Sequence, residues 1–171
     1  MKITIIADNL TSSLTSLIDY LTANKHLVNF CCPDVQTSKG YYHLEIAHPL
    51  FNKKVCYAQA NRDIIYSALQ GADALIITST NPAEKMGKRF ATKLGIATLV
   101  VLDKTKKMPK LYSTCTKLDT LDNAKAVDKA IREAVAKEKQ AKSNKSAEIR
   151  SKNLQKQLKA KHKEKRRRRK K

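Results

Sequence analysis

Short apolar runs alternate with amphipathic segments along the first hundred residues of the chain. The runs at 2–7, 27–31, 73–78 and 96–102 are rich in β-branched residues, as in strands that are buried on both faces of a parallel sheet. Residues 41–46 form a weaker candidate for a further strand. The pattern predicts an α/β fold with an open parallel sheet of about five strands flanked by helices.

Helices are predicted between these strands and after the last one. Their apolar residues recur at the spacing of one helical face in the segments 14–21, 60–69, 83–94 and 121–135. Residues 11–13 supply hydroxyl groups that can cap the first helix, and Gly71 and Gly95 stand where helix-ending glycines are common. Asn81 and Glu84 have the spacing of a capping box.

Charge divides the chain into two parts. The whole sequence of 171 residues has a formal net charge of +20. Residues 139–171 contain 16 basic and 2 acidic side chains (+14), and residues 1–138 contain 19 basic and 13 acidic side chains (+6). We therefore expect a Rossmann-like α/β domain at 1–138 and a basic tail at 139–171. The tail has few large apolar residues to bury, so we expect it to be disordered or a solvated helix.

Cysteine usage and hydropathy indicate an intracellular, cytoplasmic protein. The four cysteines have no CxxC spacing and no histidine at zinc-finger distance, so we expect reduced thiols and no metal. The sequence lacks a GxGxxG motif, and we expect no bound cofactor. The apolar run at 1–7 is too short for the core of a signal peptide, and no run approaches the length of a membrane span.

Three stretches of the chain follow one another in an order and at a spacing that are typical of a known family. They are MKITIIAD at 1–8, the helix end Asn24-Lys25-His26 followed by a strand, and GADALIITSTNPAEKMGKRFATKLGIATLVV at 71–101. Together they resemble the N-terminal half of the retaining glycosyltransferases of family four. The resemblance covers about residues 1–105 and implies the acceptor-side Rossmann-like half of a hexosyltransferase, without the donor-binding domain.

The sequence departs from that family at two places. The loop at 9–13 has none of the glycines that let backbone amides approach the phosphates of the sugar donor. Residues 102–105 stand where the resemblance implies a histidine near the reaction centre. We therefore assign no catalytic residue and expect the isolated chain to be inactive.

Candidate ligand-binding residues follow the first strand, because open α/β sheets bind ligands at the carboxyl ends of their strands. They are Asp8, Asn9, Thr11 and Ser12. The same residue types are those of a turn and a helix cap, which is the interpretation that we favour.

The tail is the stronger candidate for a binding function. Its polyanion-binding candidates are Lys159, Lys161, Lys163, Lys165, Arg166, Arg167, Arg168, Arg169, Lys170 and Lys171. Contacts with phosphates release counterions, so we expect affinity to fall steeply with salt. We favour RNA over DNA because arginine-rich arms fold on RNA and no recognition helix is evident. We favour RNA over anionic lipid because the tail lacks an apolar face.

Two functions fit these features best. The favoured one is a glycosyltransferase-like module whose tail binds RNA, as in a ribonucleoprotein particle. The alternative is the acceptor-side subunit of a split glycosyltransferase that acts with a separate donor-binding chain at an anionic membrane surface. A Rossmann-type domain that binds a small nucleotide is a third possibility, which no GxGxxG motif supports.

Overall fold

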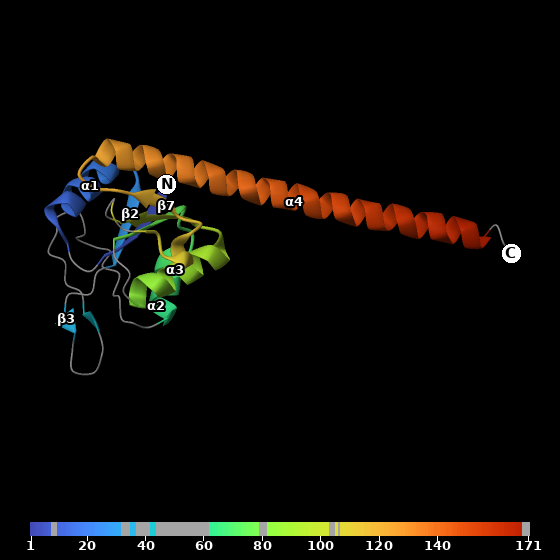
Figure 1. Ribbon diagram of the computed structural model, residues 1–171, viewed down its shortest axis with the longest axis horizontal. Coiled ribbons are helices and arrows are strands. Elements are labelled where there is room, and N and C mark those ends of the chain that lie inside the picture. Colours follow the sequence, from blue (N-terminus) through green and yellow to red (C-terminus); the bar gives the residue numbers. More distant parts are fainter. Residues whose placement is uncertain are drawn as a thin grey trace. The chain divides into compact units, whose positions relative to one another are not determined.

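The protein is described from a computed structural model (Figure 1). The described residues are 1–7, 10–31, 35–36, 42–43, 62–78, 82–102, 105 and 107–168, with only the backbone at 35–36, 42–43, 62–64, 82–83 and 158–168. The chain divides into two compact units, Met1–Ala136 and Lys137–Lys171. The last helix, α4 (Ala124–Arg168), contributes residues to both units.

Five parallel strands form the central sheet of the first unit. They are β1 (Lys2–Ile6), β2 (Leu27–Cys31), β5 (Ala74–Ile77), β6 (Ala97–Val101) and β7 (Thr116–Leu118). Their spatial order is β2-β1-β5-β6-β7, and each neighbouring pair is parallel. Ile5 of β1, for example, is paired with Phe30 on one side and with Ile76 on the other. The predicted α/β class with a parallel sheet of about five strands is confirmed.

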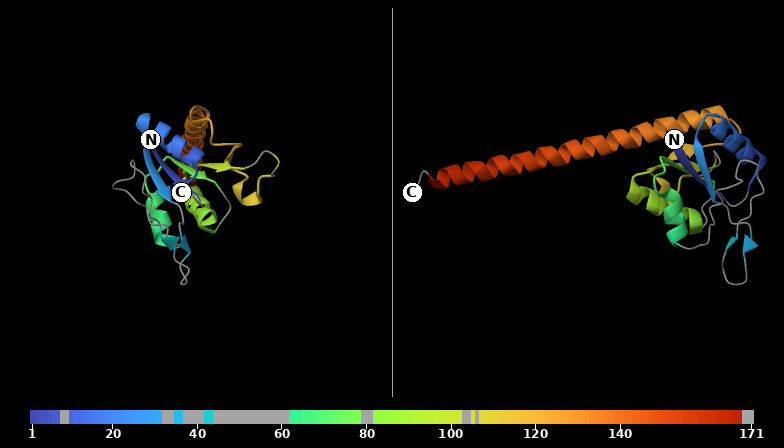
Figure 2. Two further views of the ribbon diagram at one scale, coloured as in Figure 1. Left: turned by 90° about the vertical axis from the view of Figure 1, so that its left-hand side faces the viewer. Right: turned by 180° about the vertical axis from the view of Figure 1, so that it is seen from behind.

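Helices pack on both faces of this sheet (Figures 1 and 2). On one face, the hydrophobic cluster is completed by α1 (Ser12–Ala23) and the first turns of α4. On the other face, it is completed by α2 (Arg62–Leu69), α3 (Pro82–Leu94) and the 3₁₀ helix η2 (Lys110–Tyr112). Successive strand residues alternate between the clusters, as the pleat of a strand requires: Ile76 belongs to the first, and Leu75 and Ile77 belong to the second.

The apolar faces predicted for the first and last helices are the faces that pack on the sheet. In α1, the buried residues are Leu14, Leu17, Ile18 and Leu21. In α4, the buried apolar residues are Val127, Ile131, Ala134 and Val135. Hydrophobic burial on the sheet therefore fixes the first turns of α4, although the helix as a whole is strongly polar.

One predicted strand lies elsewhere, and another strand was not predicted. Of the strand expected at 41–46, only β4 (Tyr42–His43) is described, and it pairs antiparallel with β3 (Val35–Gln36) in a separate two-stranded sheet; the rest of the range lies outside the described residues. The fifth strand of the central sheet is β7 instead. Its apolar signal in the sequence is weak because Leu118 is the one apolar residue of the three. Leu118 is also the one that is buried, and β7 lies at the edge of the described sheet.

Candidate functional sites

The strand order reverses between β1 and β5, which is where open α/β sheets bind ligands. Asp8 and Asn9, which follow β1, lie outside the described residues. Thr11 is the N-cap of α1, because its Oγ1 accepts a hydrogen bond from the backbone amide of Leu14 at 3.3 Å. Ser12 is the exposed first residue of α1. Thr11 thus has the predicted capping role, and a ligand at this loop stays a prediction.

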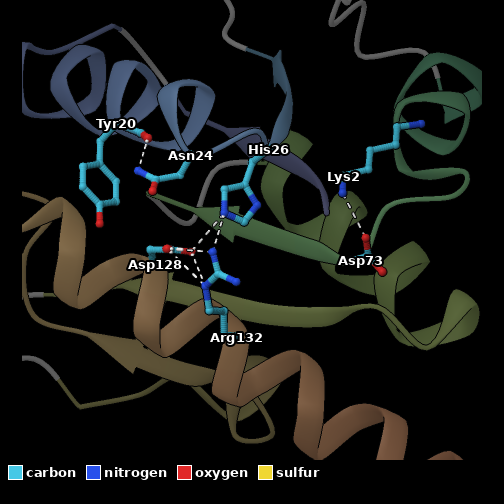
Figure 3. Close-up of polar contacts among 7 residues, drawn as sticks. All are labelled: Lys2, Tyr20, Asn24, His26, Asp73, Asp128 and Arg132. Atoms are coloured by element: carbon cyan, nitrogen blue, oxygen red, sulfur yellow. Dashed lines mark hydrogen bonds and ion pairs between the residues drawn. The ribbon is translucent and has the colours of Figure 1, made fainter.

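A polar cluster of buried His26 and Asp128 and exposed Arg132 joins α4 to the turn between α1 and β2 (Figure 3). His26 Nε2 lies 3.2 Å from Asp128 Oδ1 and 3.0 Å from Arg132 Nη2, and Arg132 Nη2 lies 3.1 Å from Asp128 Oδ2. Burial lowers the pKa of His26, as do the N-terminal amino group and Arg132, while Asp128 acts in the opposite direction. A neutral imidazole can accept the hydrogen bond from Arg132. We assign this cluster a structural role, since it ties α4 to the domain.

The described part of the basic tail is helical, because α4 continues to Arg168. All side chains at 139–157 are exposed, and residues 169–171 lie outside the described residues. From position 142 onward, basic residues recur at alternating spacings of three and four. This basic stripe consists of Lys142, Lys145, Lys152, Lys156, Lys159, Lys163 and Arg166, with Ile149 at one position of the row. The spacing keeps the stripe within about a third of the helix circumference.

A pocket of about 730 Å³ lies between α3 and the segment that contains η2. The lining residues of this α3–η2 pocket are Met86, Lys88, Arg89, Phe90, Thr92, Lys93, Lys110, Leu111, Ser113 and Thr114. Among these described lining residues there are four basic side chains and no acidic one. The pocket combines positive charge with an apolar wall.

Lys88 connects the pocket to a group of buried polar residues. The residue is 5% exposed, and its Nζ donates a hydrogen bond to Thr114 Oγ1 at 3.2 Å. Burial raises the pKa of Tyr112 to about 12, and the nearby carboxylate of Glu84 adds to the effect. Burial also raises the pKa of Cys115, although Lys88 opposes this. Tyr112 and Cys115 are therefore protonated near neutral pH, and neither is activated as a nucleophile.

This pocket could not be predicted from the sequence. Its lining residues come from two segments, 86–93 and 110–114, which no shared motif connects. A lysine on an amphipathic helix is normally exposed to solvent, so the sequence does not predict that Lys88 is buried. The one available signal is its position, because Glu84, Lys88 and Ala91 share one side of α3, at the border of its apolar face.

Comparisons with known proteins leave the family open. No protein-family model matches the sequence, and no curated protein matches it. Within the described ranges, no group of three or more histidine, cysteine, aspartate or glutamate side chains is placed to hold a metal ion. No helix in the described part of the chain combines the length and the apolar character needed to cross a membrane. The glycosyltransferase resemblance therefore stays a hypothesis.

Proposed function

We propose that this protein binds RNA through the basic stripe of α4. The observation that carries the proposal is the concentration of charge: residues 139–171 have a net charge of +14, and much of it falls on one side of a helix. The α/β domain is the folded part of the protein to which the basic tail is attached. As the chain carries no assigned catalytic residue, the proposed activity is binding alone.

The dimensions of the stripe suit the backbone of a nucleic acid. With a rise of about 1.5 Å per residue, the helix from position 142 to position 166 is about 36 Å long. Lysine and arginine side chains along that length can contact a series of phosphates. Such contacts fix position and orientation without reading base sequence. RNA binding by the stripe would therefore depend on the charge and shape of the RNA backbone and not on its base sequence.

At 139–157, the part of the tail whose side chains are described, the exposed large apolar residues argue against a bilayer as the partner. An interfacial helix needs one continuous apolar face. Ile149 and Leu154 are 51% and 59% exposed, but their spacing of five residues places them about 140° apart around the helix. They cannot form one apolar face. We favour RNA over DNA because arginine-rich segments such as residues 166–169 are typical of RNA-binding arms.

A salt titration of RNA binding with two matched triple variants tests the proposal. The stripe variant is K145Q/K152Q/K156Q, and the control is K139Q/R150Q/K161Q, whose three positions share a different side of α4. Each variant removes three charges from the full-length protein, and glutamine keeps a good helix propensity. We expect the stripe variant to reduce the slope of log affinity against log salt by about 2–3, and the control to reduce it less.

The possible outcomes separate the competing functions. Equal losses in the two variants would show that charge density matters and that the stripe is not the RNA-facing side. RNA affinity unchanged in both would overturn the proposal. The same titration with anionic liposomes is the second arm, and a preference for liposomes would favour the membrane-bound glycosyltransferase subunit instead.

A further inference from the structure

We infer that the α3–η2 pocket is a binding site for a nucleoside phosphate, separate from the basic tail. Its volume of about 730 Å³ lies within the range of small-molecule pockets. Such pockets are usually lined by apolar side chains with a few polar groups that fix the orientation of the ligand. Most of the lining surface of this pocket is apolar, although seven of its ten described lining residues are polar or charged.

The charges of the lining select an anion with several negative oxygens. Arg89, Lys93 and Lys110 are exposed at the pocket, and Lys88 is buried beside it. Glu84 is buried one turn before Lys88 on α3, but it does not line the pocket. Several basic side chains around one cavity are more than a ligand with a single carboxylate would require. A phosphate or diphosphate, with several charged oxygens, matches them better.

The buried lysine marks this as a built site rather than a chance group of surface charges. A lysine is rarely buried, because removing its charge from water is unfavourable without a partner. The hydrogen bond to Thr114 Oγ1 fixes the Lys88 ammonium at the wall of the pocket. A fixed ammonium loses little side-chain freedom when an anion binds.

The apolar wall indicates a ligand with a flat or apolar body next to its phosphates. Met86, Phe90 and Leu111 line the same cavity as the cations, and Leu111 is an exposed large apolar residue. An inorganic anion would make no use of that wall. A nucleobase can pack on it, and Ser113 offers a hydroxyl group to the sugar, while the Thr92 hydroxyl already donates a hydrogen bond to the Lys88 carbonyl at 2.9 Å. A nucleoside phosphate has all these parts.

Calorimetric titration of the full-length protein with ADP, in the absence of divalent metal, tests the assignment. Lys93→Glu reverses a lining charge, and we expect it to weaken ADP binding about tenfold or more. Lys85→Glu is the matched control, because Lys85 is exposed on the same helix and lies outside the described pocket lining. Weak binding of ADP to the tail is common to all variants, so their difference reports on the pocket.

Two further arms test the base and the source of the nucleotide. Leu111→Ser should weaken ADP binding and leave pyrophosphate binding unchanged, because only ADP has a base to pack on Leu111. Competition of ADP with a five-nucleotide single-stranded RNA separates the sources. Displacement of ADP by the RNA at comparable or lower concentration indicates a nucleotide of an RNA chain, and failure to displace it indicates a free nucleotide.

The inference is overturned by any of three results. The first is an equal loss of ADP binding in Lys93→Glu and Lys85→Glu. The second is pyrophosphate binding as tight as that of ADP, with no effect of Leu111→Ser, which would leave a simple anion site. The third is that neither ADP nor the short RNA shows any binding that is weakened by Lys93→Glu.

Discussion

Lys25 ends α1 in a backbone conformation that disfavours a lysine. Its φ is 62°, in the left-handed region. The amide of Lys25 donates to the carbonyl of Thr22 at 2.9 Å, and the amide of His26 donates to the carbonyl of Leu21 at 3.0 Å. The same pair of hydrogen bonds ends α3, where the left-handed residue is Gly95 with a φ of 64°. Two helices of this domain thus share one ending, with glycine in only one of them.

Replacing Lys25 by glycine should stabilise the protein. We expect Lys25→Gly to raise the free energy of unfolding by about 0.5–1 kcal/mol, because relief of the left-handed conformation exceeds the extra entropy of glycine in the unfolded chain. Chemical denaturation measures the change. Lys25→Ala is the control, since it removes the same side chain but keeps a Cβ. A gain as large in Lys25→Ala would contradict the backbone explanation.

The neutral state of His26 should make stability depend on pH. Burial lowers the pKa of His26 in the folded protein below the ordinary value of 6.5. The unfolded chain therefore binds a proton more readily, and the stabilising contribution, complete above pH 6.5, is lost as pH falls toward and through the lowered pKa. We expect the free energy of unfolding to decrease between about pH 7.5 and pH 5.5, measured by denaturation at each pH.

The variant His26→Gln isolates this residue from other titrating groups. Glutamine has polar atoms near the positions of the imidazole nitrogens but does not titrate. The variant should be less stable at neutral pH, and its stability should change less over the same pH interval. A pH dependence identical to that of the original protein would show that His26 is not the group responsible.

At the scale of elements, the closeness of α3 to the sheet depends on a glycine. A Cβ added at Gly87 would lie 2.5 Å from Ile6 Cδ1 and 3.8 Å from Leu75 Cδ2. Ile6 is buried in the core and cannot turn out to solvent. Gly87→Leu should therefore destabilise the protein by about 1–3 kcal/mol through overpacking. Thermal or chemical denaturation measures the loss.

The matching control places the same side chain on the exposed side of α3. Lys85→Leu adds a leucine two residues away, where α3 faces solvent. Its effect should be within about 0.5 kcal/mol, as for most surface substitutions. If Gly87→Leu were tolerated as well as Lys85→Leu, α3 could move away from β1 at little cost.

Elements were predictable from the sequence where one pattern sufficed. The apolar face of α1 has four residues at helical spacing, and all four are buried. The strand β7 carries no such pattern, because one buried residue, Leu118, cannot define a period. At residues 41–46 the composition favours extended structure, but it does not specify the partner of β4. The partner, β3, is close by in the sequence, but strands of two residues carry no alternation that would distinguish this local pairing from a place in the central sheet.

The sites were predictable to a smaller degree. The basic tail could be predicted from composition alone, because the net charge of a segment follows directly from its sequence. The α3–η2 pocket was not, because it exists only when α3 and the segment at 110–114 come together. The role of His26 was hidden for the same reason: its partners Asp128 and Arg132 are about a hundred residues away in the sequence.

At the scale of the whole molecule, the described core and most of the net charge lie in different parts of the chain. The last buried residue of the described chain is Val135, so a chain ending at Gln140 keeps every described core residue. It also loses nearly all of the +14 charge that begins at residue 139. We expect this shortened chain to unfold in one cooperative transition with a midpoint close to that of the full-length protein. We also expect it to lose most of its RNA affinity, and the salt dependence with it.

A second truncation tests the boundary from the other side. A chain ending at Lys129 lacks Ile131, Ala134 and Val135, which pack in the cluster with α1. Loss of Ile131 alone should cost about 2–5 kcal/mol, by analogy with large-to-small substitutions in cores. Circular dichroism melts of the two truncated chains, run beside RNA binding, measure both properties. An unstable chain ending at Gln140 would show that the tail stabilises the fold, and undiminished RNA binding by that chain would place the main RNA site on the α/β domain.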